Sequence, residues 1–334
     1  MGRSHGTDSG PTVLYLLGKG RAGSTLLDNT LGQLEGFVSV GELLHLWDWG
    51  LLSGWSCGCG TPIPRCSLWS EVLDVAFGDK IIDPAARAAI LDDQREVLSW
   101  RRLPRLLTTA RRGDVGDWPA LRRYCDVLSR TYRAVSEVSG ARIIVDSSKW
   151  PASPTALGLV PGIDTVVVQL VRDPRAVIYA WKKHKTWTDR PGEQEMPRFG
   201  SAYSVSSWWA RSITSELVRR NAGRDRQALI RYEDFVRDPR TTLGRIASLV
   251  GERPELSFVS DDAIHLEPSH TVGGNPTRMS AGRVPLRLDD EWVREQSTAD
   301  TVVTTLATLP LLRRYGYPLG KHARAVSAPE VSRP

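Results

Sequence analysis

Short apolar runs, separated by longer stretches with helical periodicity, are the main pattern along this chain. The runs show little alternation of polar and apolar residues, which is typical of parallel strands that are buried on both faces. They predict strands over Thr12–Leu17, Phe37–Val40, Arg142–Val145, Thr165–Val171 and Ala228–Ile230.

Helical segments lie between these strands. A long helical pattern runs from Pro84 to Ser139, and the glycines and proline of residues 113–119 break it into at least two helices. Further helices are predicted over 240–250 and 289–312. The apolar positions recur at steps of three and four residues, namely Leu27, Leu31 and Leu34 in the first helix and Leu121, Tyr124, Leu128, Tyr132 and Val135 in the long pattern.

Strands that alternate with helices predict an α/β fold of three layers, a mostly parallel sheet flanked by helices. We find no repeat or linker, so the sequence predicts one domain over residues 1–334, with a helical cap insertion over about 77–140. Residues 43–70 are rich in Trp, Gly and Cys and are expected to form a surface loop region with one helical turn. An irregular stretch is expected over 260–288 and a flexible tail over 320–334.

Composition and charge narrow the class of protein. Among 334 residues, 41% are hydrophobic and 25% are charged, which excludes a disordered chain and a fibrous repeat. The sequence lacks the run of ~20 apolar residues that crosses a bilayer and the apolar core of a secretory signal, so we expect no membrane partner and a cytoplasmic location.

The excess of 44 Lys and Arg over 38 Asp and Glu is small and dispersed, which argues against nucleic acid as a partner. The preference for arginine over lysine is typical of a GC-rich bacterial genome, and no heptad pattern specifies an oligomeric state.

The four cysteines are Cys57, Cys59, Cys66 and Cys125. The first three offer thiolates to a metal, but structural zinc sites have four ligands and usually C-x2-C spacing, and no histidine lies nearby in sequence. A zinc site and a disulfide stay open as alternatives. We expect free thiols in a reducing cytosol and no bound metal.

The strongest local signal is the sequence GKGRAGST at residues 18–25, between the first strand and the first helix. Gly18 and Gly23 let backbone N–H groups turn inward, and the helix N-terminus adds partial positive charge for a phosphate. The spacing matches G-x-x-x-x-G, but Ser24 stands where a nucleoside-triphosphate loop has lysine. Arg21 would instead contact the anion from the side. The loop therefore predicts a phosphate site without the usual grip on a triphosphate.

Polar residues also follow three other predicted strands. They are the sequences DSSK at 146–149, RDPR at 172–175 and RYED at 231–234. The carboxyl ends of parallel strands meet at one edge of the sheet, where ligands bind in open α/β folds. Together these strand ends predict one anion-binding crevice.

With these residues the chain resembles the sulfotransferases that use 3′-phosphoadenosine-5′-phosphosulfate (PAPS). GKGRAGSTLL is similar to their 5′-phosphosulfate loop, and VQLVRDPRAVIYAW to their 3′-phosphate-binding strand and helix. RYEDFVRDPRTTL resembles a later segment of the family, and DSSK, CGCGTPIPRCSLW and HTVGGNPTRM resemble features of its bacterial branch. The resemblance covers about residues 12–295. It implies a P-loop-like fold and transfer of a sulfuryl group from PAPS to a hydroxyl or amine of a small-molecule, glycan or carrier-bound acceptor.

The resemblance also implies roles for single residues. Arg172 would bind the 3′-phosphate, and Tyr232 would lie beside the adenine. A family serine eight residues after that arginine is replaced here by Ala180, which removes a hydrogen bond worth roughly 1.5–3 kcal/mol. Weaker cofactor binding, or a substitute such as Lys149 or Arg278, is therefore expected. The 5′-phosphosulfate would be held by Lys19, Gly20, Arg21, Ala22, Gly23, Ser24, Thr25 and Leu26.

The family's general base is glutamate in some branches and histidine in others. Glu42 stands in VSVGELLHL, within the Gly-Glu step that some members place shortly after the phosphate-loop helix. His270 in SHTVGGNP is the rival base, and Glu42 is preferred. Arg21 would stabilise charge on the bridging oxygen as its bond to sulfur breaks. A sulfuryl group carries less charge than a γ-phosphoryl group, so no metal is expected.

Two other functions fit part of the pattern. A nucleotide-dependent kinase would use Mg²⁺ and a triphosphate, but the loop lysine is missing and Arg172 stands where a metal-binding aspartate would help. A nucleotide-binding homologue without catalysis would account for Ala180, whereas the presence of Arg21 and Glu42 speaks against it.

Tryptophans are dense around the candidate segments. The acceptor is expected to enter between the sheet edge and the helical cap, and a bulky apolar or glycosidic acceptor is expected if at least three of these rings face the cleft. The tryptophans are Trp47, Trp49, Trp55, Trp181, Trp187, Trp208 and Trp209.

Overall fold

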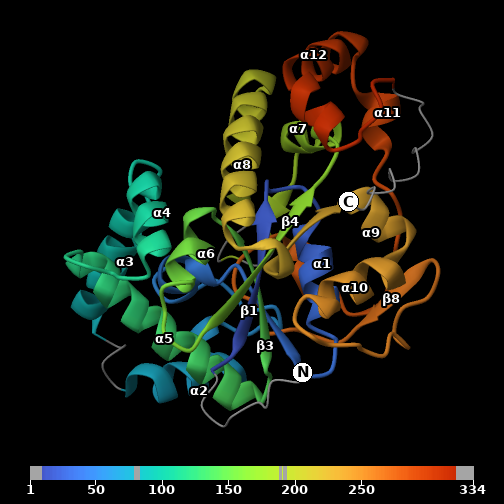
Figure 1. Ribbon diagram of the computed structural model, residues 1–334. Helices are drawn as coiled ribbons and strands as arrows, with labels where there is room; N and C mark the ends of the chain where they lie inside the picture. Colours follow the sequence, from blue (N-terminus) through green and yellow to red (C-terminus); the bar gives the residue numbers. More distant parts are fainter. Residues whose placement is uncertain (1–9, 79–82, 188–189, 191–193, 321–334) are drawn as a thin grey trace.

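A five-stranded parallel sheet forms the centre of the molecule (Figure 1). The computed structural model describes residues 10–78, 83–187, 190 and 194–320. The strands lie in the order β2-β3-β1-β4-β7, and each neighbouring pair is parallel. The predicted α/β class is therefore confirmed. The strands are β1 (Thr12–Gly18), β2 (Phe37–Gly41), β3 (Ile143–Lys149), β4 (Asp164–Val171) and β7 (Gln227–Arg231).

The central strand β1 is buried on both faces. Its residues Val13, Tyr15 and Leu17 pack into one apolar cluster, and Leu14 and Leu16 pack into the other. All five side chains are inaccessible to solvent. This double burial explains the unbroken apolar run in the sequence.

Helices cover both faces of the sheet (Figure 1). Residues of α5 and α6 contribute to the cluster on one face, and residues of α1 and α10 to the cluster on the other. The helices of the described ranges are α1 (Ser24–Leu31), α2 (Ser67–Phe77), α3 (Pro84–Val97), α4 (Leu103–Arg112), α5 (Pro119–Ser139), α6 (Ala152–Leu157), α7 (Pro174–Lys182), α8 (Ser201–Asn221), α9 (Tyr232–Arg237), α10 (Pro239–Ser248), α11 (Glu291–Glu295) and α12 (Thr298–Arg314).

The predicted helical break is confirmed, because α4 ends at Arg112 and α5 begins at Pro119. The apolar face of α5 packs inward as predicted, with Leu121, Tyr124 and Val135 buried. The helix contacts α2, α3 and β3.

Strand β3 continues four residues beyond the predicted end and includes the DSSK sequence. The polar side chains of this extension are buried. Their burial is tolerated because they have hydrogen-bond partners. Asp146 Oδ2 accepts a hydrogen bond from Tyr132 Oη at 2.5 Å, and Asp146 Oδ1 accepts one from the backbone N–H of Ser148 at 2.7 Å.

The expectation of a surface loop over residues 43–70 is wrong. This segment contains short helices over Leu43–His45, Leu46–Gly50 and Ile63–Arg65 before α2 begins. Its large side chains Trp47 and Trp69 are at most 4% exposed, because they pack into the same cluster as α5. Glycine and cysteine suggested a loop, but the apolar residues between them are part of the core.

The stretch over 260–288 is also more regular than expected. It contains an antiparallel pair, β8 (Ala263–Leu266) and β9 (Gly282–Pro285), and a short helix over Pro276–Met279. Strands of four residues leave too little sequence for an alternating pattern to be recognised. A second short pair joins β5 (Thr186–Trp187) to β6 (Gln194–Glu195).

The sequence pattern did not single out helix α8, although it has 21 residues. Its buried face carries Ser204, Ser212 and Ser215 beside Trp208 and Val218, so the inward positions are mostly small and polar. None of the helices within the described ranges is both long and apolar enough to span a bilayer. Of the predicted tail, residues 321–334 lie outside the described part of the chain.

Candidate active site

A cleft of about 700 Å³ opens at the carboxyl ends of the strands. Its walls come from the β1–α1 loop, the segment after β2, the ends of β3 and β4, and the segments around Tyr232 and Asn275. This edge is where the sequence predicts an anion-binding crevice. The sequence predicts that the acceptor enters between the sheet edge and the helical insertion. None of the described residues that line the cleft lies within 83–140, so the insertion does not form a wall of this cleft.

The β1–α1 loop forms one end of the cleft. Arg21 and Gly23 adopt left-handed backbone conformations, with φ of 74° and 90°. A Cβ atom at Gly23 would lie 2.3 Å from Cδ2 of Tyr232, so only glycine lets the loop approach this ring. Ala22 is buried below the surface, at 2% exposure. The other predicted loop residues line the cleft, namely Lys19, Gly20, Arg21, Gly23, Ser24, Thr25 and Leu26.

Arg172, at the end of β4, joins the loop to the far side of the cleft. Its Nη1 donates to the backbone carbonyl of Arg21 at 3.0 Å, and its Nη2 lies 3.0 Å from Oδ2 of Asp289. The guanidinium carbon is 4.8 Å from the centre of the Tyr232 ring. The structure therefore brings together the predicted residues Arg21, Arg172 and Tyr232. Sequence reasoning missed Asp289, since it lies in a segment without a recognisable motif.

Several cations share this cleft. Burial, together with the nearby charge of Arg211, lowers the pKa of Lys19 to about 8. Burial also lowers the pKa of Arg211 to about 10, and those of Arg21 and Lys185. Cations are destabilised in this way when they lose water without gaining enough negative charge. The cleft therefore favours a ligand with several negative charges.

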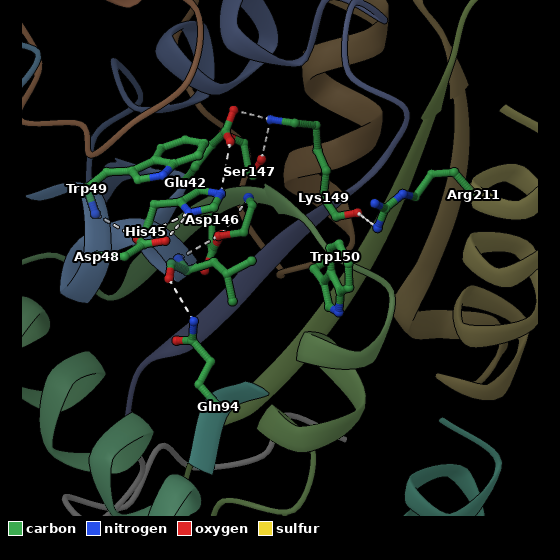
Figure 2. Close-up of polar contacts among 12 residues, drawn as sticks. Glu42, His45, Asp48, Trp49, Gln94, Asp146, Ser147, Lys149, Trp150 and Arg211 are labelled. Atoms are coloured by element: carbon green, nitrogen blue, oxygen red, sulfur yellow. Dashed lines mark hydrogen bonds and ion pairs between the residues drawn. The ribbon is translucent and has the colours of Figure 1, made fainter. Parts of the chain in front are cut away.

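Glu42 lies in the same cleft, directly after β2 (Figure 2). Its Oε1 accepts a hydrogen bond from Lys149 Nζ at 2.5 Å, and each side chain is 13% exposed. Lys149 has φ of 63°, a conformation that is rare outside glycine, and it ends β3. The backbone N–H of Glu42 donates to the carbonyl of Val272 at 2.7 Å. These contacts hold the carboxylate at one position on the cleft wall.

Sequence reasoning missed His45 as a neighbour of Glu42. His45 Nε2 lies 3.9 Å from Glu42 Oε2, and His45 Nδ1 lies 3.3 Å from the carboxylate of Asp48. The imidazole stacks on Trp49 with ring centres 3.3 Å apart, as Figure 2 shows. The sequence GELLHLWD did contain a signal for this cluster. Residues 42, 45 and 48 are three apart, and this spacing places side chains on one face of a helical turn.

Two predicted site residues do not reach the cleft. His270 Nδ1 lies 3.1 Å from Cys66 Sγ, and Arg278 is 2% exposed with its Nη2 donating to the carbonyl of Ser56 at 2.7 Å. The segment between them instead presents Gly274, Asn275 and Thr277 to the cleft. The backbone of Val272 forms hydrogen bonds with the backbones of Val40 and Glu42. This pairing determines which side chains of the segment face the cleft.

Ala180 lines the cleft, where its side chain offers no hydroxyl. Of its two expected substitutes, Arg278 lies elsewhere and Lys149 donates to Glu42 and to the carbonyl of Ser147. Lys185 also lines the cleft and lies close enough to Arg21 and Arg172 for their charges to lower its pKa, after the larger effect of burial.

Aromatic rings also line the cleft. Trp47 and Trp208 are buried elsewhere, and Trp209 donates from Nε1 to the carbonyl of Ala307 in α12. Trp150 lines the cleft although the sequence did not single it out. The predicted tryptophans that line the cleft are Trp49, Trp55, Trp181 and Trp187.

Comparisons with known proteins agree with this geometry. A family profile described as the Sulfotransferase family matches residues 13–253, which is more than half of the chain. Carbohydrate sulfotransferase 3 of Homo sapiens is 28% identical over 188 residues, which cover 52% of this chain and 37% of that relative. The chain thus matches little more than a third of the length of this curated relative.

A solved structure shows the same fold. The sulfotransferase domain of the olefin synthase of Synechococcus PCC 7002 is 20% identical, covers 96% of this chain and all of its own, and superposes with a TM-score of 0.52. The sulfotransferase domain from the curacin biosynthetic pathway is 17% identical, with coverages of 92% and 99% and a TM-score of 0.47. The profile match over most of the chain, on a fold shared with the olefin synthase domain, establishes that this chain belongs to the sulfotransferase family.

Proposed function

We propose that this protein transfers a sulfuryl group from PAPS to a hydroxyl or amine group of an acceptor. The observation that carries the proposal is the arrangement of Arg21 and Arg172 around one glycine loop, with Tyr232 against both the loop and Arg172. A nucleotide with phosphates at its 3′ and 5′ positions has the charge that this cleft lacks. The PAPS-dependent family is the one that the sequence resembles.

The donor is expected to lie along the sheet edge. Backbone N–H groups of the β1–α1 loop, with Ser24 and Thr25 at the start of α1, would bind the 5′-phosphosulfate. Arg172 would bind the 3′-phosphate, and the Tyr232 ring would lie beside the adenine. Lys185 supplies positive charge near Arg172, which offsets the hydroxyl that Ala180 does not provide.

The reaction breaks the bond between sulfur and the bridging phosphate oxygen and forms a bond between sulfur and the acceptor oxygen or nitrogen. Arg21 would stabilise the negative charge that remains on the bridging oxygen. Glu42 would take the proton that the acceptor loses. Lys149 holds Oε1 of this carboxylate, which leaves Oε2 for the acceptor. The remaining requirement is to position the two reactants, which the rigid strand ends can meet.

Calorimetry with 3′,5′-adenosine bisphosphate, the product of this reaction, tests the donor. We expect tight binding that does not depend on Mg²⁺, and an affinity lowered by about 10- to 150-fold in Arg172→Ala, because a charge-assisted hydrogen bond contributes roughly 1.5–3 kcal/mol. Arg231→Ala is the matched control, since Arg231 also ends a strand and lies 4.5 Å from a tyrosine ring, that of Tyr317, outside the cleft.

The other outcomes of this titration separate the competing functions. Preference for ATP with Mg²⁺ would favour a kinase and contradict the proposal. If neither nucleotide binds, the protein shares only its fold with PAPS-dependent enzymes, and the proposal is contradicted. Binding of the bisphosphate without sulfuryl transfer to any acceptor in a broad screen would favour the non-catalytic homologue.

Lys19 gives the donor site a specific pH dependence. Its pKa is about 8 in the free protein because the ammonium group is buried, and a bound phosphate would favour the charged form and raise that pKa. The affinity for the bisphosphate should therefore fall as the pH rises through 8. At pH 8 binding should take up protons, whereas at pH 6 Lys19 is already charged and contributes no uptake.

Calorimetry at pH 8 in buffers of different ionisation enthalpy measures this proton uptake. Lys19→Arg should keep most of the affinity and lose the uptake, because arginine stays charged throughout this range. An absence of uptake in the unmodified protein at pH 8 would show that Lys19 does not contact the anion.

The acceptor is proposed to be bulky and apolar or glycosidic, because the cleft wall around Glu42 is aromatic. The rings of Trp49 and Trp55 stack with centres 4.3 Å apart, and Trp187 lies 5.6 Å from Trp55. Trp55→Ala should raise the acceptor KM by up to about tenfold without changing bisphosphate affinity, since an aromatic contact contributes about 0.5–1.5 kcal/mol beyond its buried area.

The KM is measured with an acceptor found in a screen of phenols, alcohols and glycosides. Trp209→Ala is the control, because this ring packs against α12 and not in the cleft. An acceptor KM that stays the same after alanine replacement of Trp49, Trp55 and Trp187 in turn would contradict this role of the aromatic wall.

A further inference from the structure

Four metal-binding side chains meet outside the cleft. Cys57, Cys59, Cys66 and His270 each direct one ligand atom toward the others, and these atoms all lie within 4.8 Å of one another. The three cysteines come from the segment between β2 and α2, whereas His270 lies about 200 residues later in the chain. The sequence could not supply this fourth ligand, because only the fold brings it to the cysteines.

The ligand atoms lie at separations close to those of a tetrahedral site. Cys66 Sγ lies 3.5 Å from Cys57 Sγ and 3.8 Å from Cys59 Sγ. His270 Nδ1 lies 3.1 Å from Cys66 Sγ and 3.9 Å from Cys57 Sγ. Zinc bonds of about 2.3 Å to sulfur and 2.0–2.1 Å to nitrogen place neighbouring ligand atoms of a tetrahedron about 3.6–3.8 Å apart. All six separations lie within 4.8 Å, so a zinc ion fits once the most distant ligand atoms move closer by up to about 1 Å.

The local backbone stabilises thiolates at this place. Cys66 directly precedes α2, where the helix N-terminus carries partial positive charge. The backbone N–H of Trp69 also donates a hydrogen bond to the sulfur of Cys66. The backbone N–H of Cys59 likewise donates to the sulfur of Cys57. Cysteine binds a metal ion as the thiolate, so these contacts favour metal binding.

The two segments are also fitted to each other. A Cβ atom at Gly58 would lie 2.5 Å from both the carbonyl oxygen of Ser269 and Oγ1 of Thr271, so a side chain at this position would separate the segments. The backbone N–H of Gly58 donates to the carbonyl of Thr271 at 2.9 Å, and Trp69 Nε1 donates to the carbonyl of His270 at 2.7 Å. The four ligands are thus held in place by contacts that surround them.

We propose that Cys57, Cys59, Cys66 and His270 bind one structural zinc ion. Three thiolates and one neutral imidazole fill all four positions of the tetrahedron, so the ion has no open position for a substrate. The site would replace the free thiols that the sequence predicts, and it gives His270 a role as ligand instead of general base. The ion would connect the segment after β2 to residues 269–272, which carry the carbonyl of Val272 that accepts from Glu42.

Metal analysis of the purified full-length chain tests the proposal directly. We expect about one zinc ion per chain after growth in zinc-containing medium and dialysis against a weak chelator. Cys59→Ser and His270→Ala should lower this content severalfold, whereas Cys125→Ser should not, because Cys125 is a buried cysteine whose sulfur points to the carbonyl of Ala156. Replacement of zinc by Co²⁺ should give the visible absorption of a tetrahedral thiolate complex.

Thiol titration tests the zinc site without any substitution, so it can be used if the variants fail to fold. Thiol titration of the unmodified denatured protein should find four reactive thiols, but only after a strong chelator has removed zinc, and the same chelator should lower the Tm of the native protein. Four thiols with no stoichiometric metal, before and after incubation with zinc, would restore the free-thiol interpretation and overturn the proposal. Two thiols without a reductant would overturn it in favour of a disulfide.

Discussion

Replacing Glu42 by glutamine should lower kcat for sulfuryl transfer by about 10²- to 10⁴-fold, the usual contribution of a general base. The amide has nearly the same shape, yet it cannot accept the proton of the acceptor. The affinity for 3′,5′-adenosine bisphosphate should not change, because the phosphate-binding residues Arg21 and Arg172 are untouched. The effect should therefore appear in kcat and not in donor binding.

Single-turnover measurements of product formation separate this loss from slower product release. Glu35→Gln is the matched control, since Glu35 is an exposed glutamate before β2 and the substitution changes the same chemical group. If Glu42→Gln keeps most of the activity, the base lies elsewhere, and His45, oriented by Asp48, is the next residue to replace.

Replacing Gly23 by alanine should lower the affinity for the bisphosphate by about 10²- to 10⁴-fold. The added Cβ would lie 2.3 Å from Cδ2 and 2.6 Å from Cε2 of Tyr232, so the loop or the ring must move. Either movement misdirects the backbone N–H groups that would bind phosphate. Loss of two charge-assisted hydrogen bonds at roughly 1.5–3 kcal/mol each gives the expected range.

The control must separate the steric clash from backbone strain. Gly113 has φ of 69°, also in the left-handed region, and a Cβ atom there would meet nothing within 4 Å. Gly113→Ala should therefore cost stability without affecting nucleotide binding. Calorimetry and thermal unfolding of both variants measure the two effects, and unchanged binding in Gly23→Ala would show that the loop is not the phosphate site.

Local patterns were enough for the strands of the sheet and for the position of the glycine loop. Apolar runs marked every strand of the central sheet, because burial on both faces leaves a continuous signal. The glycine loop was recognisable because the left-handed backbone conformation at Gly23 requires glycine. Helix α8 left no such signal, since serines that pack against the sheet resemble the serines of a solvent-exposed helix.

The rest of the site depends on contacts between distant segments. Lys149 was considered as a phosphate ligand, but its left-handed backbone and the position of Glu42 after β2 bring the two into an ion pair. His270 was considered as a base because its loop resembles a family feature, yet pairing of Val272 with Val40 directs it to the cysteines. Neither outcome is contained in residues that are close in sequence.

The order of the strands has a consequence for synthesis of the protein. β1 is made first and lies at the centre of the sheet, but both of its partners, β3 and β4, begin more than 120 residues later. Within the five-stranded sheet of the described residues, the neighbour of β2 is β3, so β2 must wait as well. The nascent chain therefore carries β1 and β2 without partners until β3 has left the ribosome, and β1 keeps one unpaired edge until β4 follows. Folding during translation cannot start from the sheet, and fragments that end before Val171 should aggregate or remain bound to chaperones.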